Sequence, residues 1–193
     1  MLASLDRHTV LWLVGERRGW ITTTMTGVSA LATLGAIWIV TAIALTRRLV
    51  PVVLVVAIVE TTDLVAGFLR DVIDRPRPFV ALSQVHVLGI HPHSASFPSG
   101  HAAMGFAAVA LLALLLDDGR VLLLLVPAAL VGFSRVWLGA HYPSDVFGGA
   151  ALGLAIGASV GALVAHTRLR GSIAGAPPKR TGVANTAPGA KTR

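Results

Sequence analysis

The chain has 193 residues, of which 54% are hydrophobic and 13% are charged, and its mean hydropathy is +0.76. Because an ordinary soluble domain carries about 25% charged residues, this composition excludes a soluble protein and indicates one membrane-embedded domain. The formal net charge is +7 without a basic stripe interleaved with aromatic residues, which argues against a nucleic-acid partner, and the absence of cysteine excludes disulfide and thiolate chemistry.

The first 20 residues predict an amphipathic helix that lies in the membrane interface. Their apolar run, Val10–Val14, is too short to span a bilayer, and it is not followed by the small-residue cleavage site of a signal peptide. Trp12 and Trp20 suit the depth of the lipid headgroups. A frayed terminus is the alternative interpretation.

Five later segments are long and apolar enough to predict transmembrane helices. They cover about residues 23–46, 51–69, 101–116, 121–138 and 145–166. The sequence therefore predicts an all-α polytopic membrane helical bundle, with about five transmembrane helices and the N-terminal interfacial helix. Residues 1–166 are expected to form one domain, and residues 167–193, rich in Gly, Pro, Ala, Lys, Arg and Thr, a disordered basic tail.

The last predicted helix carries a glycine at every fourth position, at Gly149, Gly153, Gly157 and Gly161. Small residues at this spacing let two helices approach closely in lipid. We expect the ladder to pack within the bundle, and packing between protomers is the alternative. The oligomeric state stays open.

The second predicted span contains two carboxylates, Glu60 and Asp63. A carboxylate inside a membrane is costly unless it is paired or hydrated, so both need partners. With Leu64, Gly67 and Arg70 they recur at spacings of three and four, which predicts one helical face. We expect Glu60 and Asp63 to point into the bundle and orient Arg70. The alternatives are a local ion pair without function, and a proton relay in a small transporter.

The loop at about residues 71–96 carries His86, His91 and His93. Three histidines raise the question of a metal site, but no carboxylate or thiolate cluster accompanies them in the sequence. We therefore expect surface or substrate-facing histidines, and no metal or other cofactor.

Three stretches whose residues could bind a ligand or take part in catalysis fall at predicted helix ends on one face of the membrane. They are Arg70 with Arg77-Pro78, then Pro98-Ser99-Gly100-His101, then Ser134-Arg135 with His141 and Asp145. Free N–H groups at a helix start and the helix dipole favour an anion there. Arginine side chains suit a phosphoryl group, whose charge is spread over several oxygens. The three stretches together predict a phosphate site.

Within this site, His141 and Asp145 are four residues apart, so the carboxylate is expected to bind one ring nitrogen and fix the tautomer. The other nitrogen is then free to attack phosphorus. His101 would protonate the departing alkoxide, and in-line displacement requires these two groups to be opposed. Water would next attack the phosphohistidine with His101 as the base. No metal is required, because the arginines neutralise the phosphate charge.

The orientation follows from the distribution of basic residues. Five spans put the two chain ends on opposite faces, and the short loop at Arg47-Arg48 lies on the face of the C-terminus. Lys and Arg in short loops mark the cytoplasmic side. We expect a plasma-membrane protein with a cytoplasmic C-terminus and a site that faces the extracytoplasmic side.

These residues resemble the type 2 phosphatidic acid phosphatase (PAP2) superfamily, in its small bacterial integral-membrane branch. The family signature is Lys-x6-Arg-Pro, Pro-Ser-Gly-His and Ser-Arg-x5-His-x3-Asp. The sequence matches it with Arg70-x6-Arg77-Pro78, Pro98-Ser99-Gly100-His101 and Ser134-Arg135-x5-His141-x3-Asp145. The resemblance covers roughly residues 23–166. Arg70 replaces the family lysine, which keeps the charge and makes a bidentate contact possible.

The resemblance implies a PAP2/haloperoxidase-like helical core, metal independence, and roles for the matched residues. It implies that His141 is the nucleophile, Asp145 its partner and His101 the acid. It also implies a set of phosphate ligands, namely Arg70, Arg77, Ser99, Gly100 and Arg135. Many relatives have six spans, and here the short interfacial helix stands in place of the first.

The function we expect is hydrolysis of a membrane lipid phosphate through a phosphohistidine. The candidate substrates are a polyprenyl diphosphate, a phosphatidylglycerophosphate, phosphatidic acid and a decaprenyl-phosphoryl sugar phosphate. A phosphotransferase that uses the same phosphohistidine is the nearest alternative. A small proton-coupled transporter would not need both His101 and His141.

Overall fold

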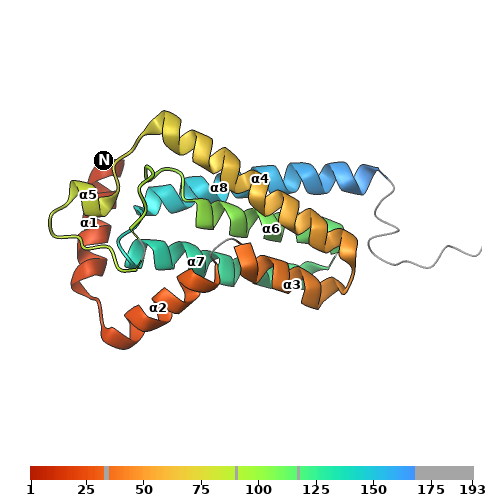
Figure 1. Ribbon diagram of the computed structural model, residues 1–193, viewed down its shortest axis with the longest axis horizontal. Helices are drawn as coiled ribbons and strands as arrows, with labels where there is room; N and C mark the ends of the chain where they lie inside the picture. The colour runs from red at the N-terminus through yellow and green to blue at the C-terminus, as the bar shows by residue number, and fades with distance from the viewer. Residues whose placement is uncertain (33–34, 90, 117, 168–193) are drawn as a thin grey trace, which may run out of the picture.

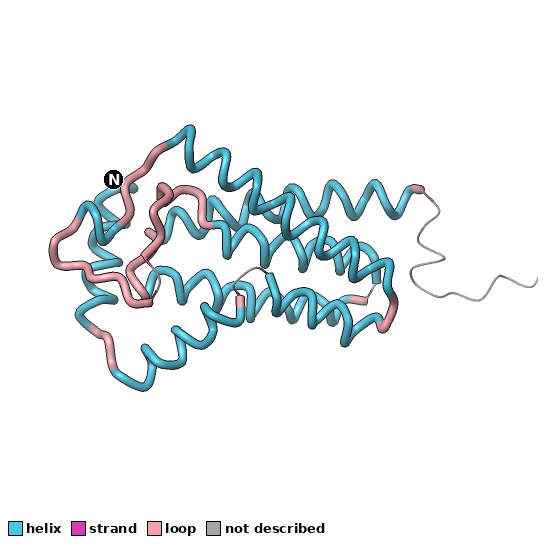
Figure 2. Tube along the Cα trace, in the orientation of Figure 1, coloured by secondary structure: helices cyan, strands magenta, loops and turns pink. Residues whose placement is uncertain are grey.

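A computed structural model describes residues 1–32, 35–89, 91–116 and 118–167, and every regular element within these ranges is a helix (Figures 1 and 2). In chain order the elements are α1 (Leu2–Gly15), α2 (Gly19–Leu31), α3 (Ala36–Thr46), α4 (Leu49–Ile73), α5 (Pro78–Ala81), α6 (Gly100–Leu116), the 3₁₀ helix η2 (Gly119–Leu124), α7 (Leu125–Trp137) and α8 (Pro143–His166). The all-α prediction is confirmed. The tail predicted to be disordered lies, from residue 168 onward, outside the described residues.

The fold is that of a multi-pass helical membrane protein, but its spans differ in detail from the five predicted. Among the described residues, three segments are long and apolar enough to cross a membrane: Leu49–Ala81, Gly119–Trp137 and Pro143–His166. The span predicted at 23–46 is divided into α2 and α3, which differ in direction by 70° and qualify together as a fourth. Helix α6 is apolar but has 17 residues, fewer than the roughly 20 that cross a bilayer.

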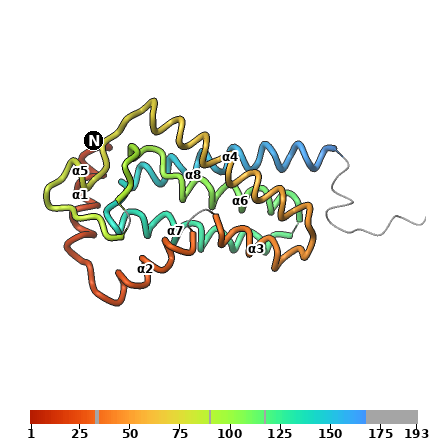
Figure 3. Tube along the Cα trace, in the orientation of Figure 1, coloured from red at the N-terminus to blue at the C-terminus, as the bar shows by residue number. Residues whose placement is uncertain are grey.

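Helix α6 lies at the centre of the bundle, with α4, α7 and α8 packed against it (Figure 3). Its sequence is apolar on all sides, and Leu111, Leu112 and Leu115 are buried. Such a pattern is typical of a helix that is surrounded by other protein rather than by water. The central position of α6 explains why the N-terminus of this helix can be reached from several elements at once.

The glycine ladder of α8 packs against α6 within the bundle, as predicted. A Cβ atom at Gly149 would lie 2.4 Å from the carbonyl oxygen of Ser99, and one at Gly153 would lie 2.1 Å from that of Ala103. The two backbones are therefore in direct contact, and a larger side chain would separate them. Near the start of both helices, the Ser99 N–H donates to the Asp145 carbonyl at 3.0 Å. The ladder thus fixes the start of α6 relative to the start of α8.

Helix α1 crosses the end of the bundle at which α5 and the starts of α6 and α8 lie (Figure 1). Val10 and Leu13 are buried on its inner face, whereas Trp12 is 61% exposed. The helix ends at Gly15, before residue 20, and Trp20, which is 74% exposed, lies in α2. This arrangement suits the predicted interfacial helix. One feature was not predicted: Asp6, on the inner face of α1, is only 3% exposed.

Candidate active site

The three motif stretches meet around one cavity of about 220 Å³ at this end of the bundle. The predicted site residues that line the cavity are Glu60, Asp63, Arg70, Arg77, Gly100, His101, Arg135 and His141. Ser99 and Asp145 are buried behind this lining, with no exposed surface. The structure therefore brings predicted residues from α4, α6, α7 and the two connecting loops together around one cavity.

His141 is positioned by the turn that ends α7. Gly139 has a φ angle of 78°, a conformation that favours glycine. The N–H groups of Ala140 and His141 then both donate to the carbonyl of Arg135, at 3.0 and 3.2 Å. This turn brings the chain back over the end of α7 and buries His141, which is 3% exposed.

The hydrogen bonds of the His141 ring define its tautomer. Nδ1 lies 2.7 Å from the carbonyl oxygen of Ser96, and because a carbonyl only accepts, Nδ1 carries the proton. Nε2 then has a free lone pair, to which the Arg77 Nη1 donates at 3.1 Å. Burial of the ring, with the charge of Arg77 adding to it, lowers the pKa of His141 to about 4. The ring is thus a neutral imidazole with its Nε2 bonded to Arg77, and His141 is one of the residues that line the cavity.

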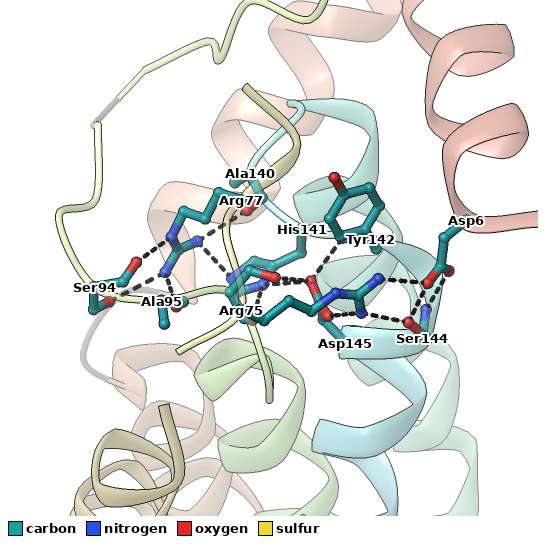
Figure 4. A network of polar contacts seen from close by, with 11 residues as sticks. Asp6, Arg75, Arg77, Ser94, Ala95, Ala140, His141, Tyr142, Ser144 and Asp145 are labelled. Carbon is teal, nitrogen blue, oxygen red and sulfur yellow. Dashed lines mark hydrogen bonds and ion pairs between the residues drawn. The ribbon is translucent and has the colours of Figure 1, made fainter. Parts of the chain in front are cut away.

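The predicted contact between His141 and Asp145 is present as an ion-pair contact, but the short hydrogen bond of Nδ1 goes to another group. The nearest carboxylate oxygen of Asp145 lies 3.5 Å from Nδ1, and the Ser96 carbonyl takes the Nδ1 proton instead. The reason is local geometry: α8 begins at Pro143, so His141 precedes the helix rather than sharing a face of it with Asp145. Asp145 instead accepts from the Ser96 hydroxyl at 2.6 Å and from the Tyr142 N–H at 2.8 Å. Asp145 therefore fixes Ser96, whose carbonyl in turn accepts from the His141 ring. Figure 4 shows Asp145 beside His141 and Tyr142.

Arg77 ties two loops together beside the His141 ring. Its guanidinium donates to the carbonyls of Ser94 at 2.6 Å, Ala95 at 3.0 Å and Ala140 at 2.9 Å. These bonds fix the guanidinium plane against Nε2 of His141 (Figure 4). A predicted phosphate ligand is therefore also the group that joins the loop before α6 to the loop before α8.

Arg70 reaches the cavity from α4. Its Nη2 lies 3.4 Å from a carboxylate oxygen of Asp63, so the predicted orientation of Arg70 by Asp63 is confirmed. Glu60 lines the same cavity but makes no hydrogen bond or ion pair to the described part of the chain, and Leu64 is 74% exposed. Glu60 is exposed as well, so this face of α4 points only partly into the bundle, in contrast to the predicted inward direction of Glu60 and Asp63. A Cβ atom at Gly100 would lie 2.6 Å from Asp63 Oδ1 and 2.8 Å from Arg70 Nη1, so a larger residue there would displace these two side chains.

Several polar atoms around the cavity have hydrogen-bonding capacity left over. Nε of Arg70, Nε of Arg135 and the Ser99 hydroxyl are buried and have no hydrogen-bond partner in the described residues. Buried polar groups are nearly always bonded, so those that are not call for an explanation such as a ligand. Two of the three are guanidinium donors, which suits an anion with several oxygens.

The three loop histidines do not belong to this site. His86, His91 and His93 are exposed, and the cavity lining does not include them. Across the described ranges, no three His, Cys, Asp or Glu side chains gather closely enough to hold a metal ion. The loop that carries these histidines contributes Ser94 and Ser96 to the site instead.

Sequence reasoning missed the supporting residues Asp6, Arg75, Ser96 and Ser144. Ser96 acts partly through its backbone carbonyl, for which no residue type gives a signal. The sequence does carry a signal for Asp6. This residue stands four positions before Val10 and seven before Leu13, so it shares their buried face of the helix.

Comparisons with known proteins identify relatives of this chain. Residues 48–168 match the model of the PAP2 superfamily. Undecaprenyl-diphosphatase BcrC of Bacillus subtilis is 43% identical over 82 residues, 42% of each chain. Decaprenylphosphoryl-5-phosphoribose phosphatase of Mycobacterium tuberculosis is 40% identical over 103 residues, which cover 52% of this chain and 51% of that protein. The chain spans about half the length of the curated relatives it matches.

Two solved structures share the fold. One is a transmembrane PAP2 type phosphatidylglycerolphosphate phosphatase from Bacillus subtilis, with a TM-score of 0.71, 26% identity, and coverage of 86% of this chain and 87% of that one. The other is Aquifex aeolicus LpxE, with a TM-score of 0.69, 25% identity, and coverage of 82% and 95%.

Proposed function

The chain belongs to the PAP2 superfamily, and from this membership we propose that it is an integral-membrane lipid phosphatase. The observation that carries the proposal is the state of His141. Its Nδ1 proton is held by the Ser96 carbonyl, its unprotonated Nε2 accepts from Arg77, and the residue lines a cavity together with Arg70, Arg77 and Arg135. A phosphoryl group bound there would take the place of Nε2 as a partner of Arg77. A nucleophilic nitrogen beside several guanidinium groups suits attack on a phosphoryl group.

In the proposed reaction, the phosphoryl group binds to the guanidinium groups of Arg70, Arg77 and Arg135 and to Ser99 and Gly100 at the start of α6. Nε2 of His141 forms a bond to phosphorus while the bond from phosphorus to the lipid oxygen breaks. His101 gives its proton to that departing oxygen. Water, deprotonated by His101, then attacks the phosphohistidine, which releases inorganic phosphate and restores neutral His141. Asp145 holds Ser96, and through it the ring, during both steps.

A lipid phosphomonoester or diphosphate is the substrate class that fits best. The apolar helices keep the cavity within reach of the bilayer, and large side chains such as Val53, Phe68 and Phe147 are exposed on their outer surfaces. Relatives are named for undecaprenyl diphosphate, decaprenylphosphoryl-5-phosphoribose and phosphatidylglycerophosphate, and phosphatidic acid remains a further candidate. The Arg47-Arg48 connection lies at the end of the bundle opposite the site (Figure 1), which supports a site on the extracytoplasmic face of the plasma membrane and a cytoplasmic C-terminus.

Phosphate release from a panel of these lipid phosphates in detergent micelles tests the proposal. We expect release from at least one of them, and we expect it to persist in EDTA because guanidinium groups neutralise the phosphate charge. The His141→Ala protein, purified in parallel, controls for contaminating phosphatases. The absence of release from every lipid phosphate, or activity that is lost in EDTA and restored by a divalent cation, would contradict the proposal.

The lowered pKa of His141 gives a second expected result, in the pH dependence of kcat/KM. Attack requires a neutral ring, and burial lowers the pKa of His141 to about 4. The acid limb due to His141, in which the rate falls as the pH drops, should therefore lie at about pH 4 rather than near the usual histidine value of about 6.5. Loss of the proton from the proposed acid His101 gives a separate limb, in which the rate falls as the pH rises.

The substrate titrates as well, because a phosphomonoester has its second pKa near about 6. That pKa is measured separately by phosphorus NMR, and its contribution is divided out of the profile. An acid limb of the enzyme, with the rate falling as the pH drops, that remains near pH 6.5 after this correction would show that His141 is not held neutral as the geometry indicates.

A further inference from the structure

Asp6 bonds to the start of the helix that carries Asp145. One carboxylate oxygen accepts from the Ser144 N–H at 3.0 Å, and the other accepts from the Ser144 hydroxyl and from Arg75 Nη2, the latter at 2.8 Å. Asp6 is 3% exposed, so its charge is shielded from water and depends on these partners. Helix α1 is therefore attached to the first turn of α8 by a buried carboxylate.

Arg75 connects this carboxylate to Asp145. Its Nη2 donates to Asp6, and its Nη1 donates to Asp145 at 2.6 Å and to the Ser144 hydroxyl at 2.7 Å (Figure 4). The guanidinium lies 4.3 Å above the Tyr142 ring. Only a planar guanidinium presents two nitrogens to two separate carboxylates in this way, whereas a lysine ammonium is a single point charge.

The same hydrogen-bonded line continues to the imidazole. Asp145 accepts from the Ser96 hydroxyl at 2.6 Å, and the Ser96 carbonyl accepts the Nδ1 proton of His141 at 2.7 Å. The hydrogen bonds thus form one series, in which each residue orients the next, from Asp6 to Arg75, Asp145, Ser96 and His141. Arg75 itself lies between α4 and α5, outside any helix, so its direction depends on the groups that it bonds.

We propose that Asp6, acting through Arg75, is a positioning residue for the proposed nucleophile His141. The inference rests on the proposed function. Asp6 orients the guanidinium that fixes Asp145, and Asp145 in turn fixes the carbonyl that sets the His141 tautomer. Helix α1 therefore takes part in catalysis although it contributes no group to the cavity lining.

The test replaces Asp6 with asparagine in the full chain. The amide keeps the size of the carboxylate but turns a donor toward Arg75 or Ser144, both of which donate. We expect kcat to fall about tenfold, the size of effect typical of an outer-shell partner. KM should change less than about twofold, because the arginines of the cavity are untouched. Glu16→Gln, an exposed carboxylate at the other end of α1, is the matched control and should leave both constants unchanged.

Two further measurements separate positioning from a general loss of structure. Nitrogen-15 NMR of the histidine rings, with His141 assigned by its loss in His141→Gln, should show protonated Nδ1 in the wild type and a mixture of tautomers in Asp6→Asn. Arg75→Lys should lower kcat, and adding Asp6→Asn to it should lower kcat no further, because both changes break the same line.

The outcomes distinguish this inference from the proposed function. An Asp6→Asn protein with unchanged kcat and unchanged ring signals would overturn the positioning role, as would fully multiplicative losses in the double variant. A wild-type ring with the proton on Nε2 would instead contradict the nucleophile on which the proposed function depends.

Discussion

Replacing His141 with alanine is expected to abolish phosphate release from lipid substrates, with a loss in kcat of about 10⁵- to 10⁶-fold. In the proposed reaction the imidazole is the nucleophile that forms the phosphohistidine, and without it the proposed phosphate-binding arginines could not divide the reaction into two steps. Within the described part of the chain no second histidine has the same support, since His101 lies at the first turn of α6 rather than against the Ser96 carbonyl. Phosphate release from the purified variant measures the loss directly.

His141 is buried, so the alanine variant needs a control for folding. His141→Asn keeps a side-chain N–H that can donate to the Ser96 carbonyl but carries no nucleophilic nitrogen. It should retain binding of inorganic phosphate and a near-normal thermal transition while being as inactive as His141→Ala. In the wild type, acid quench of a radiolabelled substrate should trap an acid-labile phosphoenzyme that both variants lack. Turnover within a hundredfold of wild type in either variant would contradict the proposed nucleophile.

The helices were predictable because apolar periodicity and length indicate where helices form, and α4 and α8 agree with the predictions to within a few residues. Hydropathy could not tell whether a helix faces lipid or protein, because both surroundings are apolar. For this reason α6 was predicted as one span among five, whereas it is the central helix. The direction change between α2 and α3 was likewise hidden, since an apolar run has the same composition whether it is straight or bent.

The site was predictable as far as its chemistry depends on residue types at helix ends. His101, Arg135 and His141 line one cavity as expected. The groups that orient them were not predictable in the same way. The acceptor for His141 is a backbone carbonyl, and the partner of Arg75 lies 69 residues away in α1. Such contacts depend on how the helices pack, which a linear pattern does not report.

Replacing His101 with alanine is expected to lower kcat/KM by about 10³-fold for an alkyl lipid phosphate but by less than about tenfold for an aryl phosphate. General acid catalysis contributes roughly 10²- to 10⁴-fold, and it is needed most when the leaving oxygen is a poor leaving group. An alkoxide must be protonated as it departs, whereas a nitrophenolate leaves without help. The comparison of kcat/KM on the two substrates therefore tests the role of His101, which lines the cavity together with His141.

The constant kcat should respond differently, because it also contains hydrolysis of the phosphohistidine. His101 is the proposed base for that step, so His101→Ala should release nitrophenolate in a burst of one equivalent per site and then turn over slowly. The wild type should show no such burst if its second step is not limiting. His86→Ala, which removes an exposed histidine outside the cavity, is the matched control and should behave as wild type on both substrates.

Equal losses of kcat/KM on the alkyl and aryl substrates would mean that His101 binds the phosphate rather than protonating the leaving group. The acid would then have to come from another group in the cavity lining, of which Glu60 is the carboxylate without a partner in the described residues.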